Sequence, residues 1–112
     1  MSPQTPATHT CPEFYEQFHA LTDTDLGKDE VVLVGRVVFL NHMGAAVFLR
    51  VGDRTTSTTQ LYVRGDAVDA ARKFKLHDEV WARGTAMRTR LGELSLRVEE
   101  CAPAVKTLTS EH

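Results

Sequence analysis

The sequence is poor in the residues that build metal and redox sites. It has two cysteines, Cys11 and Cys101, which lie near opposite ends of the chain and form no paired motif. Its five histidines are scattered, and none stands at metal-ligand spacing from a cysteine or a carboxylate. A glycine-rich phosphate loop is also absent. We therefore expect free thiols, no metal and no bound cofactor.

Long apolar runs are missing as well. No stretch approaches the length of a membrane span, and the first six residues have neither a basic start nor an apolar segment, so we expect a cytoplasmic protein with no membrane contact. The chain has 112 residues, of which 42% are hydrophobic and 25% charged, as in a single globular domain. We expect a disordered N-terminal tail over residues 1–11, a folded domain over residues 12–108 and a C-terminal tail over residues 109–112.

The chain also lacks a surplus of positive charge. Thirteen Lys and Arg residues stand against fifteen Asp and Glu residues, which gives a net charge of -2 at pH 7. This balance argues against strong, sequence-independent binding of nucleic acid. Basic residues nevertheless outnumber acidic ones in the middle of the chain, which is compatible with a modest, specific contact with RNA. A solvated surface of mixed charge explains most of these residues equally well.

Hydrophobic periodicity predicts five strands and two helices. A short amphipathic helix is expected over residues 12–21, with Pro12 at its start, and a second helix over residues 67–74, with Asp66 as its N-cap. The first strand should bend at Gly35, since a glycine inside a strand marks a bulge or a coil. The expected strands cover residues 31–40, 45–51, 60–64, 79–88 and 93–100. Strands three and four would then flank the second helix. This order is typical of an all-β OB-fold, a five-stranded Greek-key barrel, here with an added N-terminal helix.

One face of the expected sheet carries side chains that suit unpaired bases. Val47, Leu49, Leu61 and Val63 should point inward, which leaves an aromatic ring, an amide, a phenol and a guanidinium pointing outward on neighbouring strands. The last strand adds Glu93, Ser95 and Arg97 to this outward side. Rings can stack on bases, and fixed polar groups can read base edges. The outward candidates on the second and third strands are Phe48, Gln60, Tyr62 and Arg64.

Further candidates for RNA contact are polar residues around this face. Asn41 and His42 are expected in the turn after the first strand, and Arg36, Arg64, Arg88 and Arg90 could neutralise phosphates. Simpler interpretations stay open: Phe48 could fill the edge of the core, Tyr62 could buttress it, and the polar and charged residues could be ordinary surface groups.

Several motifs carry a resemblance to a known family. They are Gly35-Arg36-Val37, Met43-Gly44, Phe48, Gln60-Leu61-Tyr62-Val63-Arg64, Phe74-Lys75 and the run from Arg88 to Ser95. In this order the motifs resemble the N-terminal anticodon-binding domain of bacterial lysyl-tRNA synthetases, over roughly residues 31–108. The resemblance implies that a transfer RNA anticodon loop lies across the outer sheet, that Phe48 stacks on its central base, and that Gln60 and Glu93 hydrogen-bond uracils. The chain departs from the family at Asn41, His42 and Ala45, where basic residues are usual.

The resemblance also bears on catalysis. In that family, amino-acid activation belongs to a catalytic domain several times larger, whose motifs are not among these residues, so we expect no ligase activity from this chain. Two other classes remain open: a general module for single-stranded RNA or DNA, and a protein-interaction module. A homodimer or a synthetase partner is also compatible with the sequence.

Overall fold

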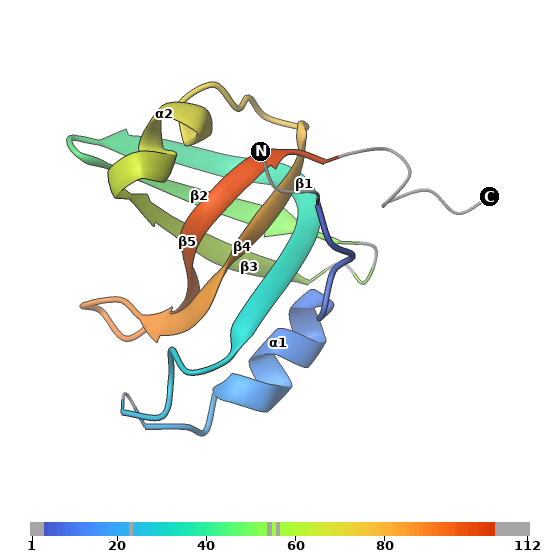
Figure 1. The fold of residues 1–112 in the computed structure, drawn as a ribbon, viewed down its shortest axis with the longest axis vertical. Helices are drawn as coiled ribbons and strands as arrows, with labels where there is room; N and C mark the ends of the chain where they lie inside the picture. Colours follow the sequence, from blue (N-terminus) through green and yellow to red (C-terminus); the bar gives the residue numbers. More distant parts are fainter. Residues whose placement is uncertain (1–3, 23, 54, 56, 105–112) are drawn as a thin grey trace.

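The computed structural model describes residues 4–22, 24–53, 55 and 57–104. The predicted tail at residues 109–112 therefore lies outside the described residues. The described part forms five strands, two short α-helices and one 3-10 turn (Figure 1). The elements are α1 (Cys11–Phe18), β1 (Glu30–Met43), β2 (Ala46–Gly52), β3 (Thr58–Arg64), η1 (Gly65–Ala67), α2 (Val68–Ala71), β4 (Glu79–Arg88) and β5 (Leu94–Pro103).

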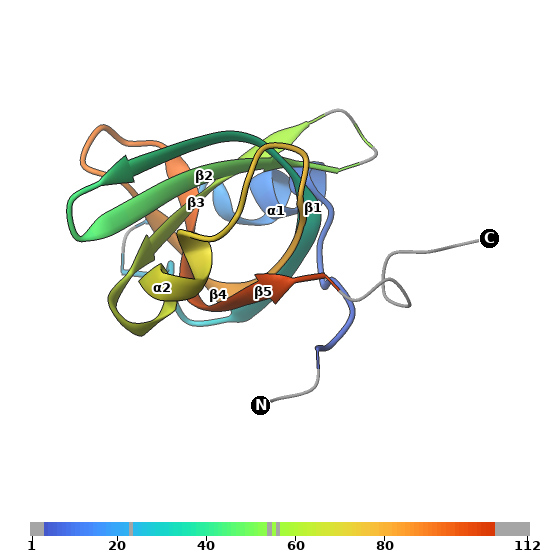
Figure 2. The same ribbon diagram turned by 90° about the horizontal axis from the view of Figure 1, so that it is seen from above.

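The strands close into a barrel in the order β1-β2-β3-β5-β4. All neighbouring pairs are antiparallel except β3 and β5, which run parallel. Seen from above, the strands surround a single interior (Figure 2). Alternate side chains of every strand fill that interior, among them Val47, Leu49, Leu61, Val63 and Leu96, each 0% exposed. This arrangement confirms the prediction of a five-stranded Greek-key barrel with a helix between the third and fourth strands.

The N-terminal helix covers one end of the barrel, and α2 lies at the other (Figure 1). The Phe14 and Phe18 side chains of α1 enter the core, and each is 1% exposed. Helix α1 begins one residue earlier than predicted because Thr10 caps it: the Thr10 hydroxyl accepts a hydrogen bond from the Glu13 N–H, and the Glu13 carboxylate accepts one from the Thr10 N–H at 2.8 Å. Pro12 lies in the first turn, as expected, and the helix ends at Phe18 rather than at residue 21.

Strand β1 differs from its prediction in two ways. The bulge in its pairing with β2 lies between Val37 and Phe39 and not at Gly35, although the strand passes from pairing with β4 to pairing with β2 next to Gly35, at Arg36. Gly35 instead allows a close approach, since a Cβ there would lie 2.8 Å from a backbone oxygen of Gly52. The strand also continues to Met43, so Asn41 and His42 are strand residues and the predicted turn position for them is wrong.

The second helix is shorter than predicted. A 3-10 turn precedes only four α-helical residues. The N-cap positions are Arg64 for the 3-10 turn and Ala67 for the α-helix, so the prediction of Asp66 as the N-cap is wrong. Ala67, Ala71 and Phe74 are buried as expected, together with Val68. Burial against the barrel therefore holds this segment in place although it is too short to be stable as an isolated helix.

The last strand also has different bounds. It begins at Leu94, one residue after Glu93, and runs to Pro103, three residues beyond the predicted end. Ser95 was predicted to be an exposed outward residue, yet it is 0% exposed. Its neighbours across the sheet, Gln60 of β3 and Met87 of β4, flank it on both sides.

The N-terminal segment packs along the outside of the barrel. Composition predicts disorder over residues 1–11, but the Thr8 N–H donates to the Val32 carbonyl at 2.9 Å. The Trp81 indole N–H donates to the Thr5 carbonyl at 2.8 Å. Trp81 is 1% exposed and pairs with Val34 on the outer side of β1, so this segment hides an apolar patch that would otherwise face water.

Candidate functional site

The outer face of β2, β3 and β5 gathers most of the predicted binding residues. The register pairs Phe48 with Tyr62, Arg50 with Gln60, and Gln60 with Ser95. Because side chains alternate along a strand, these residues share the face opposite the buried core. Phe48, Gln60 and Tyr62 are half-buried on this face, which we call the outer face.

Two aromatic rings form the centre of the outer face. The Phe48 and Tyr62 ring centroids are 5.1 Å apart, and their planes are tilted by 44°. Arg64 Nη1 donates a hydrogen bond to the Tyr62 hydroxyl at 3.3 Å. This contact fixes the phenol beside Phe48 and leaves ring surface for a base to stack on.

A polar network lies beside the rings. The Ser95 hydroxyl donates to the Gln60 Oε1 at 2.9 Å, so the Gln60 amide nitrogen remains available to donate. Arg50 forms an ion pair with Glu93 through Nη2 and donates from Nη1 to the Thr58 hydroxyl at 3.2 Å. Sequence reasoning missed the positioning contacts of Arg50 and Ser95, although the outward position of Arg50 next to Gln60 was a usable signal.

Glu93 reaches this network from the turn between β4 and β5. Gly92 adopts a φ of 92°, a conformation that favours glycine, and its N–H donates to the Thr89 carbonyl at 2.8 Å. The Thr89 N–H donates to the Glu93 carbonyl at 3.0 Å, and the Thr89 hydroxyl accepts from the Glu93 N–H at 3.1 Å. The turn thus holds the Glu93 carboxylate next to Arg50.

Three predicted residues, Asn41, Arg64 and Arg90, lie around the border of the outer face, and a fourth, His42, does not. Asn41 pairs with Phe48 and shares its side of the sheet, whereas His42 pairs with Val47 and therefore points to the opposite side. Arg64 lies exposed at the end of β3, and Arg90 is exposed in the β4–β5 turn.

Two predicted arginines are engaged elsewhere. Arg36 forms an ion pair with Glu79 of β4 at 3.2 Å. Arg88 donates a hydrogen bond to the His19 carbonyl at the end of α1. The structure therefore does not bring these two guanidinium groups to the rings, and Arg88 joins the N-terminal helix to the barrel.

A cluster of acids on β1 and β5 surrounds a single arginine. Arg83 of β4 lies 2.9 Å from Glu30, 3.1 Å from Glu99 and 3.2 Å from Glu100. Hydrogen bonding to Glu30 raises the pKa of the Arg83 guanidinium. One guanidinium thus partly offsets the charge of three carboxylates.

The two thiols are buried and unreactive in character. Cys11 and Cys101 are 4% and 7% exposed, and they are free cysteines. Desolvation by burial raises the pKa of each thiol to about 11.

Within the described part of the chain, His, Cys, Asp and Glu side chains form no group that could hold a metal ion. Among the same residues, no helix has the length and apolar content that a membrane crossing requires.

Comparison with known proteins identifies relatives of this barrel. The model of a family described as an OB-fold nucleic acid binding domain (tRNA_anti-codon) matches residues 31–104. The chain is 34% identical to a lysine–tRNA ligase of Halalkalibacterium halodurans and 38% identical to one of Shouchella clausii, each over 90% of this chain. It is 33% identical to the heat-inducible lysine–tRNA ligase of Escherichia coli strain K12 over 89% of the chain. The chain spans 21% of the length of each of these relatives.

Proposed function

This chain belongs to the tRNA anticodon family of OB-fold nucleic acid binding domains, and from that premise we propose that its outer face binds the anticodon loop of a transfer RNA. The observation that carries the proposal is the juxtaposition of the Phe48 and Tyr62 rings with the Gln60 amide and the Glu93 carboxylate. Stacking surface beside fixed hydrogen-bonding groups is what recognition of unpaired bases requires.

Phe48 supplies the stacking surface for the central base of the anticodon. It lies on the middle one of three neighbouring strands, and Tyr62 supports its ring from β3. Stacking depends on the π-face that every base has, so this contact contributes affinity without choosing a base.

Gln60 and Glu93 supply the choice of base. With its oxygen held by Ser95, the Gln60 amide directs its nitrogen outward as a donor, which suits the O4 acceptor of uracil and opposes the amino group of cytosine. A carboxylate accepts hydrogen bonds only, so Glu93 suits the N3–H of uracil and opposes the unprotonated N3 of cytosine. The pair therefore favours uracil at the positions it contacts.

Exposed basic groups around the outer face supply a modest phosphate contact. Arg64 and Arg90 lie at its border, whereas Arg36 and Arg88 are engaged with protein groups. With neutral Asn41 in β1 and neutral Ala45 in the β1–β2 turn, we expect weak binding with a moderate salt dependence.

We assign recognition of a cytoplasmic transfer RNA, not amino-acid activation, to this chain. The ligase activity in the names of the relatives belongs to proteins of which this chain spans 21%. The purified 112-residue chain should show no lysine-dependent pyrophosphate exchange with ATP. Measurable exchange would refute the assignment.

Binding to an anticodon stem-loop tests the function. The parent chain should bind a stem-loop with the anticodon UUU more tightly than a UCU loop or a scrambled loop in a mobility-shift or fluorescence-anisotropy titration. Phe48→Ala should weaken all loops alike by about 1–3 kcal/mol, the contribution of one stacked base. Gln60→Ala and Glu93→Ala should reduce the preference for uracil and leave the UCU affinity nearly unchanged.

Two outcomes would contradict this proposal. Equal affinity for the UUU and scrambled loops would indicate a general module for single-stranded nucleic acid. An absence of RNA affinity would indicate a protein-interaction module, in which case a homodimer or a synthetase is the partner to seek. Circular dichroism melting of each variant provides the folding control, since changes at half-exposed positions usually shift stability by less than about 0.5 kcal/mol.

A further inference from the structure

The bulge in β1 places two consecutive apolar side chains on the outer face. Val37 pairs with Val51 and Phe39 with Arg50, so Val38 is the extra residue and both Val38 and Phe39 stand opposite Arg50. Val38 is 47% exposed and Phe39 is 51% exposed. Phe39 thereby differs from Phe14, Phe18 and Phe74, whose side chains are buried almost completely.

Phe39 lies next to the proposed stacking ring. In the β1–β2 register, Asn41 pairs with Phe48, so Phe39 is the diagonal neighbour of Phe48 on the same side of the sheet. Diagonal neighbours of this kind are about 7–8 Å apart and within reach of each other's aromatic side chains. The rings of Phe39, Phe48 and Tyr62 therefore follow one another across β1, β2 and β3.

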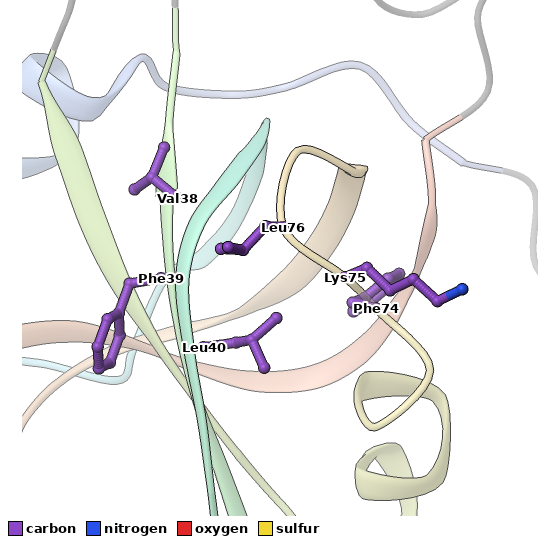
Figure 3. Close-up of a pocket in the computed structure, with 6 residues that line it drawn as sticks. All are labelled: Val38, Phe39, Leu40, Phe74, Lys75 and Leu76. Atoms are coloured by element: carbon purple, nitrogen blue, oxygen red, sulfur yellow. The ribbon is translucent and has the colours of Figure 1, made fainter.

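A shallow pocket adjoins Phe39 at one end of this row of rings. It lies between β1 and the segment after α2, has a volume of about 470 Å³, and is lined by Val38, Phe39, Leu40, Phe74, Lys75 and Leu76. The Phe39 ring points away from the side of β1 on which Leu40 and Leu76 lie (Figure 3). Phe39 thus belongs to the rim of the pocket, while its ring faces the side of β1 away from Leu40.

We propose that Phe39 is a second stacking platform, which binds an unpaired loop base just outside the anticodon. This inference rests on the proposed RNA binding and extends it from the anticodon bases to a flanking loop nucleotide. We expect RNA to cover Phe39 because this residue extends the outer face that is proposed to bind the anticodon loop. Its cross-strand partner Arg50 also brings a guanidinium beside it.

The size of the patch favours a base over a second protein chain. A phenylalanine ring buries about 150–250 Å² when it is fully covered. A stable protein interface buries about 800 Å² on each partner. Val38 and Phe39, each about half exposed, offer only a small fraction of that area but enough for one base.

Substitution at Phe39, combined with a scan of the RNA loop, tests the proposal. Phe39→Ala in the full 112-residue chain should weaken binding of the UUU stem-loop by at least about fivefold, the lower end of what one stacked base contributes. Replacing the loop nucleotides outside the anticodon one at a time by abasic residues should identify one position that produces the same loss in the parent chain. That abasic RNA should bind the parent and Phe39→Ala chains equally.

Three further variants separate stacking from other effects. Phe39→Tyr keeps the ring and should retain parent affinity, whereas Phe39→Leu keeps apolar bulk without a ring and should bind as weakly as Phe39→Ala. Leu76→Ala is the matched control, because Leu76 is also 51% exposed but lies on the other side of β1, and its affinity should not change. These three variants and Phe39→Ala should all have melting temperatures within a few degrees of the parent chain.

The outcomes distinguish a failure of the second stacking platform from a failure of the proposed anticodon binding. Parent-like binding by Phe39→Ala with weakened binding by Phe48→Ala would overturn the second platform and leave the anticodon proposal intact. Parent-like binding by both variants would overturn the outer face as the RNA site. Loss of a concentration-dependent dimer in Phe39→Ala, measured by sedimentation and without an RNA effect, would show that a second copy covers the ring.

Discussion

Replacement of Ser95 by alanine gives a sharp test of how the outer face selects a base. The Ser95 hydroxyl is fully buried and donates to the Gln60 Oε1 at 2.9 Å. Without that hydroxyl, the Gln60 amide can rotate and present either its oxygen or its nitrogen to the ligand. The substitution removes one oxygen atom and adds none, so the surrounding strands can keep their positions.

The size of the effect follows from one hydrogen bond. A typical hydrogen bond contributes about 0.5–1.5 kcal/mol net, and 1.4 kcal/mol corresponds to a tenfold change in affinity, so Ser95→Ala should lose about two- to twelvefold in affinity for a UUU loop. Gln60 is half-exposed, and water can replace the lost partner of its oxygen, so the melting temperature should change little. A UCU loop should be bound at least as well as before, because the ordered amide offers cytosine no matched contact, whereas a rotated amide can accept a hydrogen bond from the cytosine amino group.

A double-mutant cycle identifies the route of the effect. Affinities of the parent, Ser95→Ala, Gln60→Ala and double-mutant chains for UUU and UCU loops should show that Ser95→Ala has no further effect once Gln60 is removed. An equal loss for both loops, or an undiminished loss in the Gln60→Ala chain, would refute the positioning role of Ser95.

Other parts of the fold give three further predictions. Gly84→Ala should destabilise the chain by about 3 kcal/mol in urea unfolding, because its Cβ would lie 1.9 Å from a backbone oxygen of β5, whereas Gly52→Ala makes only ordinary contacts and should fold normally. Cys11 and Cys101 should resist alkylation at pH 8 in the folded chain and react only after unfolding, since burial raises the pKa of both thiols to about 11. Burial opposes ionisation of Asp53, but hydrogen bonds from the Cys11 N–H and from Thr55 lower its pKa below the ordinary 3.8. Asp53→Asn should therefore be less stable than the parent chain near neutral pH, and the difference in stability should shrink as the pH falls below about 4. A difference that stays unchanged at low pH would contradict this prediction.

Strand identity and facing could be predicted from the sequence where one side of the sheet is core and the other is not. In β2 and β3 the inward residues Val47, Leu49, Leu61 and Val63 alternate strictly with larger or polar outward ones, and all four are buried as predicted. The bounds of β4 also agree with the prediction. A slip of one residue would expose the whole apolar set, so the pattern determines the register strongly.

The remaining differences arise where contacts distant in sequence decide the local structure. Gly35 looked like the site of the bulge, but its lack of a Cβ serves close packing against Gly52, and the bulge follows at Val38. Ser95 looked exposed because only the closed barrel, through the parallel pairing of β3 with β5, brings Gln60 over it. The hydrophobic periodicity of the sequence indicates neither the bulge at Val38 nor the burial of Ser95, since each depends on which strands become neighbours in the barrel.

Glu93 raises an electrostatic question, because it places an anion on a face proposed to bind a polyanion. Its ion pair with Arg50 offsets the repulsion, and the two side chains are 42% and 32% exposed, so the pair stays near solvent. Partly exposed pairs of this kind contribute only about 0–1 kcal/mol, which lets the Glu93 carboxylate accept a base N–H without a large loss. The proposed function therefore predicts that Arg50→Ala weakens binding of every loop sequence, since it would leave an uncompensated carboxylate facing the phosphates. It predicts that Glu93→Ala affects only loops with uracil at the contacted position. On this proposal we expect affinity and choice of base to depend on different members of the same ion pair.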